Sequence, residues 1–456
     1  MVFSILLVFI YTFLTFLVIK KVFHGDPFYL LIYILFFLPF YSFFQLLVFK
    51  TSDSIVLLNF IRYSKDIVIF SSFVVFIFGS KSSFFLNQYK LSSLDKWIIY
   101  FTLIVSIYAL LPIGEVGLWI KLIYAKNLFF IPIIYFLGRN TDFDFNRFRF
   151  IKKTLSILFI IAFVVASIEY FFGIHLQSII GYSNYNLIVN DTLPTGNFDL
   201  SWTFERSADH KRFASFFSNP LEYSASLLLF MTIPVFHLLH NQRNKLMNLI
   251  WILLIIISFY FAYSRASIIS AFLIVVSALL ITKNFKILFY CFVLFLIGLF
   301  VLYYNTSEDT LYFILDTFTF KESSTVGHLL EWIQALIAIV ENPFGLGLAL
   351  SGNASVVDQS IKVGGENQFL IYGVQMGVLS IIIYSIILYK SITISLRVYF
   401  KSNGFKRELG FISGLVKLGL LIPLFTANAE LYLFISIFSW FLIGQSQKII
   451  SELKYQ

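Results

Sequence analysis

The sequence predicts an all-α integral membrane protein, a helix bundle that crosses the bilayer about 12–13 times. Of its 456 residues, 59% are hydrophobic and 12% are charged, whereas about 25% of residues are charged in soluble domains. The mean hydropathy is +0.87, and the 58 phenylalanines exceed what one water-facing core could bury. Lipid must therefore surround much of the protein surface.

Apolar segments long enough to span a bilayer recur along the whole chain. A spanning helix needs about 20 mostly apolar residues. Thirteen segments are candidates: 2–19, 27–49, 54–79, 97–113, 118–138, 154–172, 220–239, 247–263, 266–282, 287–304, 369–389, 408–425 and 430–445. The first is followed by Lys20 and Lys21 rather than by a small-residue cleavage site, so we expect a retained helix and not a signal peptide. We expect one transmembrane domain, residues 1–456.

The distribution of basic residues predicts the orientation, because short cytoplasmic loops are rich in Lys and Arg. One set of alternate loops holds most of them: Lys20, Lys21, Lys81, Lys90, Lys96, Arg139, Arg147, Arg149, Lys152, Lys153, Arg243, Lys245, Lys283, Lys286, Lys390, Arg397, Lys401, Lys406, Arg407, Lys448 and Lys454. We therefore predict a cytoplasmic C-terminus and two large extracytoplasmic loops, 173–219 and 305–368. The net charge of +9 follows this topology rather than forming one patch, so we expect no nucleic-acid partner.

Residues 326–340 of the second loop predict a short interfacial helix. The segment is apolar, and at about fifteen residues it is too short to span the bilayer. Asn342-Pro343 ends it. Its polar side chains share one helix face: His328, Glu331, Gln334 and Glu341. The glycines of the following PFGLGL motif, Gly345 and Gly347, permit a sharp turn and a close approach of the backbone.

Several charged residues fall inside the predicted spans. Arg62 and Asp66 are four positions apart and are expected to form an ion pair on one helix face. Lys126 and Lys417 have no local partner. Each either snorkels or pairs within the protein, or contacts an anionic ligand in a cavity.

The strongest functional signal is a basic cluster at the end of the first loop, where Arg206, Lys211 and Arg212 precede a span. Arg265 lies in a tight connection between two apolar segments on the same predicted side. A guanidinium group matches phosphate oxygens and stays charged, so phosphate binding would explain the cluster. The alternative is a solvated loop end, neutralised by neighbouring acidic residues.

Three residues of the second loop could complete a site. His328 and Glu366 are candidates for a general base, and Asn367 is a candidate polar contact. The acidic residues of this loop form no compact ligand motif. We therefore predict no metal and no cofactor.

The order of these segments resembles the O-antigen ligase and O-antigen polymerase (Wzy-type) family of bacterial membrane glycosyltransferases. The resemblance extends from about Lys126 to Glu430. It rests on RFASFFSNP before a span, SRA between two spans, H-x-x-x-W leading into NPFGLGL, and ENQ before a span with a following glycine. Many members have arginine at the position of His328 and His-Asn in place of Glu366-Asn367.

The resemblance implies transfer of a glycan from undecaprenyl diphosphate to an acceptor hydroxyl, without a metal, on the extracytoplasmic face of the bacterial plasma (inner) membrane. It implies catalytic roles for Arg212, Arg265, His328 and Glu366, and substrate-binding roles for Arg206, Lys211, Lys126 and Asn367. The implied partners are the lipid-linked oligosaccharide, the bilayer, and the flippase and chain-length regulator of the same pathway.

Three functions remain open at this point. A polymerase joins lipid-linked repeats to one another, whereas a ligase transfers the glycan to the lipid A core. The aromatic-rich N-terminal half and the ENQ variant favour the polymerase. A flippase or transporter would need pseudo-symmetric halves and sites at the bilayer midplane, whereas the polar residues of this chain collect in two loops.

Overall fold

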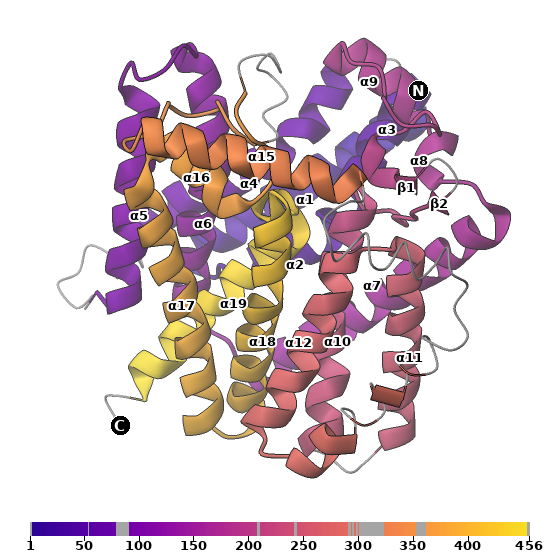
Figure 1. Cartoon of the computed structure of the whole chain (residues 1–456), viewed down its shortest axis with the longest axis vertical. Coiled ribbons are helices and arrows are strands. Elements are labelled where there is room, and N and C mark those ends of the chain that lie inside the picture. Colours follow the sequence, from indigo (N-terminus) through magenta and orange to yellow (C-terminus); the bar gives the residue numbers. More distant parts are fainter. Residues whose placement is uncertain are drawn as a thin grey trace.

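The computed structural model describes residues 2–52, 54–78, 91–207, 210–240, 244–290, 323–352 and 362–453, with a few single positions between 293 and 300. Helices make up most of these residues, and the strands are confined to one short pair (Figure 1). The first half contains α1 (Val2–Phe23), α2 (Phe28–Phe37), α3 (Tyr41–Ser52), α4 (Ile55–Phe78), α5 (Ser93–Leu110), α6 (Leu118–Asn140), α7 (Phe145–Phe172), α8 (Leu176–Ile179), α9 (Tyr182–Asn190), η1 (Trp202–Phe204), β1 (Glu205–Ser207) and β2 (His210–Lys211). The second half contains α10 (Pro220–His240), α11 (Lys245–Ala262), α12 (Arg265–Ile281), α15 (Ser323–Glu341), α16 (Gln368–Met376), α17 (Val378–Lys401), α18 (Gly404–Thr426), η3 (Ala429–Leu431) and α19 (Leu433–Glu452).

The predicted class, an all-α polytopic membrane bundle, is confirmed. In the described ranges nine helices are long and apolar enough to cross a membrane, and the bent pair α2 and α3 raises the number to ten. The apolar helix α12 is shorter, at 17 residues. The predicted span 287–304 lies mostly outside the described residues.

Two predicted spans are wrong in detail. The span predicted at 369–389 is two helices, because the chain breaks at Gly377 and α17 continues to Lys401. Gly377 has φ 78°, and a Cβ there would overlap the carbonyl oxygen of Pro343. The span predicted at 27–49 is likewise divided, since α2 and α3 meet at an angle of 57°.

The backbone of the PFGLGL motif packs against the junction of α16 and α17 and forms hydrogen bonds with both sides of it. Gly345 and Gly347 both have positive φ, 84° and 119°. The amide of Leu346 donates to the carbonyl of Val374 at 2.7 Å, and the amide of Val378 donates to the carbonyl of Pro343 at 3.0 Å. The close backbone approach expected from the glycines is therefore confirmed, and it fixes the break between the two helices.

The long helices run along one axis, and the two ends of the bundle differ (Figure 1). At one end lie α8, α9, β1, β2 and α15, and α15 lies across the bundle. We call this the loop end. At the other end lie the C-terminus, the last residues of α10 and α17 and the first residues of α11 and α18. We call this the basic end.

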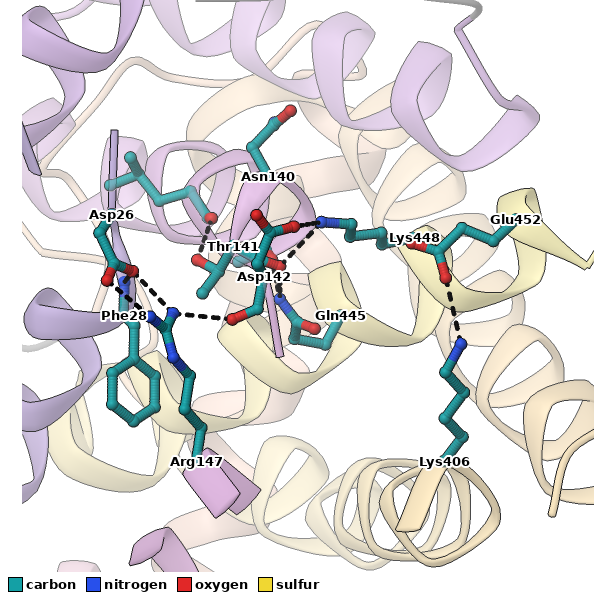
Figure 2. A network of polar contacts seen from close by, with 12 residues as sticks. Asp26, Phe28, Asn140, Thr141, Asp142, Arg147, Lys406, Gln445, Lys448 and Glu452 are labelled. Carbon is teal, nitrogen blue, oxygen red and sulfur yellow. Dashed lines mark hydrogen bonds and ion pairs between the residues drawn. The ribbon is translucent and has the colours of Figure 1, made fainter. Parts of the chain in front are cut away.

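Ion pairs at the basic end tie together connections that are far apart in the sequence (Figure 2). Arg147 at the start of α7 donates to both carboxylate oxygens of Asp26 at 2.8 Å. Lys448 on α19 pairs with Asp142, which precedes α7. The short connections α1–α2 and α6–α7 thus meet the end of α19, and that this end faces the cytoplasm stays a prediction.

Charges inside the spans are paired within the protein, although not as expected. The predicted pair of Arg62 with Asp66 is wrong, because Asp66 pairs with Lys65 at 3.0 Å and with Lys126 of α6. Asp66 thus takes its partners from the preceding residue of its own helix and from the neighbouring helix α6. Lys417 of α18 lies 3.7 Å from Glu430.

Candidate functional site

Arg206 and Arg265 are brought to the same place by Tyr263, which ends α11. The guanidinium of Arg206 stacks over the Tyr263 ring at 4.7 Å and donates to its hydroxyl. Tyr263 has φ 46°, and this left-handed residue turns the chain sharply into α12, whose first residue is Arg265. Ser264 caps α12 through its side chain.

Arg212 is positioned by a buried segment, 213–217, which follows it. The amide of Phe213 donates to the carbonyl of Phe261 near the end of α11 at 3.0 Å. The Glu169 carboxylate accepts from the amides of Ser215 and Leu176, both at 2.7 Å. The RFASFFSNP motif is thus a clamp that fixes Arg212 beside the α11–α12 turn.

Arg206, Arg212 and Arg265 lie close enough for the charges of the first and last to act on Arg212. We call them the arginine cluster. Burial, followed by the charges of Arg265 and Arg206, lowers the pKa of Arg212 to about 10. Arg212 forms no ion pair in the described part of the chain, and its buried Nε has no hydrogen-bond partner there. An anion at this place would relieve the mutual repulsion and satisfy the guanidinium.

Lys211 belongs to the framework of the cluster rather than to its centre. Its ammonium donates to the carbonyl of Gly173 at 2.6 Å and lies 4.7 Å from the Phe198 ring centroid. The contacts hold β2 against the end of α7. Next to it, burial lowers the pKa of His175 to about 4, so this imidazole is neutral at neutral pH.

The structure brings the two candidate bases together: the imidazole Nδ1 of His328 contacts the carboxylate of Glu366. His328 lies on α15, and Glu366 lies just before α16. Their side chains are 37% and 35% exposed, although the two contacting atoms are buried, so solvent or a substrate can reach the other parts of both groups. One turn further along α15, the Glu331 carboxylate accepts from the amide of Gly365 at 2.8 Å and holds this segment in place.

Asn367 and Lys126 have local partners. Asn367 is the N-cap of α16, and its Oδ1 accepts from the amides of Phe369 at 3.0 Å and Leu370 at 3.3 Å. Its burial and these two bonds fit a structural cap, although its φ of 78° lies outside the extended region usual for an N-cap. Lys126 pairs with Asp66. The predicted substrate-binding role of both residues stays a prediction, and neither has a described contact with the arginine cluster.

Sequence reasoning missed several buried carboxylates, among them Glu169, Glu222 and Glu430. Glu169 fixes the 213–217 segment, as described above. Glu222 in the first turn of α10 accepts from the amide of Phe434 at 3.1 Å, which joins α10 to α19. Glu430 accepts from Ser436, from Tyr384 and from Trp440 Nε1. A lone Glu within or beside an apolar segment was the available signal, because burial of that charge requires built-in donors.

The described residues contain no group of three or more His, Cys, Asp or Glu side chains suited to hold a metal ion. No known protein family matches the chain, and no curated protein is significantly similar to it. The observations therefore define a class, a polytopic membrane protein. At its loop end the chain combines an arginine cluster with a His–Glu pair.

Proposed function

We propose that the loop end is the catalytic face of a metal-independent glycosyltransferase in the bacterial plasma membrane, which polymerises oligosaccharide repeats carried on undecaprenyl diphosphate. The observation that supports this most is the convergence of Arg206, Arg212 and Arg265, with the Nε of Arg212 buried and unpartnered. A lipid diphosphate carries the charge and the oxygens that such a cluster requires.

The reaction is a displacement at the anomeric carbon of the donor sugar. The acceptor hydroxyl forms the new carbon–oxygen bond as the bond to the diphosphate breaks, and the diphosphate leaves with the electron pair. Fixed cations in a poorly hydrated site stabilise this developing charge. Arg212 and Arg265 are assigned this role, and Arg206 holds the diphosphate with them.

His328 is assigned the role of general base. It takes the proton of the acceptor hydroxyl, and the carboxylate of Glu366 stabilises the resulting imidazolium. The contact between the two side chains and their partial exposure support this assignment. This pair and the arginine cluster lie at the same end of the bundle (Figure 1).

The decisive test is Arg→Lys substitution at Arg212 and Arg265, measured as polymer formed per molecule of membrane-inserted protein. Lysine keeps the charge but loses the two-pronged geometry, so we expect turnover to fall by at least about tenfold. Arg397→Lys is the matched control, because Arg397 is an exposed residue of α17 outside the site. Near-normal turnover in both site variants would show that these arginines have a structural role and do not bind the diphosphate through two-pronged contacts.

Two further measurements separate the competing functions. Activity should persist in EDTA, and restoration of lost activity by magnesium or manganese would contradict an arginine-based mechanism. Deletion of the gene followed by gel analysis of surface glycan distinguishes the acceptors. A single repeat on the core indicates a polymerase, whereas long chains retained on the carrier lipid indicate a ligase.

A further inference from the structure

A second basic site lies at the opposite end of the bundle, between α7, α10 and α11. It is a cavity of about 380 Å³, within the range of about 300–1,000 Å³ found for ligand pockets. Its cationic residues, Arg149, Lys152 and Lys153, all come from the first three turns of α7. His237 near the end of α10 lies beside them.

Only part of this charge is compensated within the protein. Lys152 donates to both carboxylate oxygens of Glu408 on α18, at 2.7 and 2.9 Å. The Nε2 of His237 lies 3.3 Å from the same carboxylate. Arg149 and Lys153 are exposed, and neither forms an ion pair with a described residue. The cavity therefore retains an excess of positive charge.

The wall on the other side of the cavity is apolar. Phe159 of α7, Phe230 of α10 and Trp251 of α11 line it, and the Phe159 and Trp251 rings pack 5.2 Å apart. Outside the cavity, α7 and α11 expose large apolar side chains, among them Ile157 and Leu253. Cations thus lie near the helix ends, and an apolar surface continues from them toward the bilayer core.

The geometry points to a binding site for an anionic phospholipid, with the phosphodiester between Arg149 and Lys153 and the start of an acyl chain against Trp251 and Phe159. A soluble phosphate would use the cations but leave the apolar wall without a partner. A lipid uses both surfaces at once, and basic pockets between membrane helices recognise anionic headgroups in this way. The site is separate from the arginine cluster and does not depend on the proposed function.

The test uses the full-length protein in detergent, titrated with short-chain phosphatidylglycerol, with phosphatidylcholine or with glycerol phosphate, and reads the shift in unfolding temperature. A ligand that binds only the folded state raises this temperature. We expect a saturable rise with phosphatidylglycerol and much weaker effects of the other two. The variant Arg149→Ala/Lys153→Ala should bind phosphatidylglycerol about 25-fold more weakly, since each cation contributes roughly fivefold.

Two matched variants complete the design. Arg397→Ala/Lys401→Ala removes the same charge from exposed positions of α17 at the same end and should bind as the wild type does. Ser156→Trp fills the cavity without changing its charge and should abolish binding. Equal loss in the two double-alanine variants, equal stabilisation by glycerol phosphate, or no stabilisation of the wild type by phosphatidylglycerol would each overturn the assignment.

Discussion

The buried pair of Lys417 and Glu430 should be strongly coupled energetically. Their side chains are 1% and 7% exposed, and Nζ lies 3.7 Å from Oε1. At an effective dielectric constant of about 20, two unit charges at this distance attract by roughly 4–5 kcal/mol. Loss of one partner leaves the other charge buried without compensation, which typically costs about 3–5 kcal/mol.

The remaining contacts decide which single variant is worse. In Lys417→Met, Glu430 keeps its three donors, Ser436, Tyr384 and Trp440. In Glu430→Gln, Lys417 loses its compensating charge and faces a neutral amide, a 3.4 Å contact with Ser439 and the face of the Trp440 ring. We therefore expect Lys417→Met to cost about 3 kcal/mol and Glu430→Gln to cost about 4–5 kcal/mol.

The assay is a double-mutant cycle on the free energy of unfolding, measured for purified protein in mixed micelles of increasing denaturing detergent. The double variant Lys417→Met/Glu430→Gln should recover at least about 2 kcal/mol of the summed single losses. Lys406 and Glu452 provide the matched control, because this pair joins α18 to α19 at 3.2 Å but is 36% and 45% exposed. Its coupling should be about 0–1 kcal/mol. Equal coupling in the two cycles would refute the reasoning.

Three further predictions address the loop end, the helix break and the topology. Burial lowers the pKa of His175 from 6.5 to about 4, so the unfolded chain takes up a proton first as the pH falls, and stability should drop by about 3 kcal/mol between these values. Unfolding measured against pH should show this drop, and His175→Phe should flatten it. Gly377→Ala should lower the yield of folded protein, because its φ of 78° and the nearby carbonyl of Pro343 exclude a Cβ; a normal yield would contradict this. In a cysteine-free background, Ser201→Cys should react with a membrane-impermeant reagent in intact cells and Asn403→Cys only after permeabilisation, and the reverse order would invert the orientation.

The helices could be predicted from the sequence, but their breaks could not. A long apolar segment specifies a helix wherever lipid is the solvent, because no other open structure satisfies the backbone there. The end of that helix depends on what lies beside it. The backbone of the PFGLGL motif, which begins 34 positions earlier at Pro343, packs against Gly377 and leaves no room for a side chain there. The apolar residues of 369–389 continue across this position, so hydropathy alone does not reveal the break.

The residues of the candidate site could be selected from the sequence, whereas the side chains that hold them in place could not. Scarcity of charge singled out Arg206, Arg212 and Arg265, since a charge in an apolar chain costs free energy unless it is used. Their convergence depends on the ring of Tyr263 and on the clamp held by Glu169, which are tertiary contacts without a local signature. A preference for side-chain caps at helix starts could have indicated that Asn367 caps α16.

The lysines inside the spans have partners within the protein, which distinguishes them from Arg212, the candidate functional cation. In the spans, Lys65 and Lys126 share Asp66, and Lys417 pairs with Glu430. Lys121 donates to two backbone carbonyls, at 3.0 and 2.5 Å. Each of these cations is therefore satisfied by the fold itself.

Arg212 differs from all of them. Its Nε is buried without a hydrogen-bond partner among the described residues, and Arg206 and Arg265 add repulsion. A fold that supplies partners for every lysine just described could supply a carboxylate here as well, and an unsatisfied buried donor is costly to keep. Unsatisfied groups of this kind are found most often at functional sites, where the ligand supplies the missing partner. The introduction of that partner is therefore informative, and Tyr432, which interacts electrostatically with both Glu222 and Arg212, offers a position for it. Tyr432→Glu should raise stability if the cluster lacks an anion, and it should abolish turnover if the proposed diphosphate binds there. A variant that is less stable and still active would place the anion elsewhere.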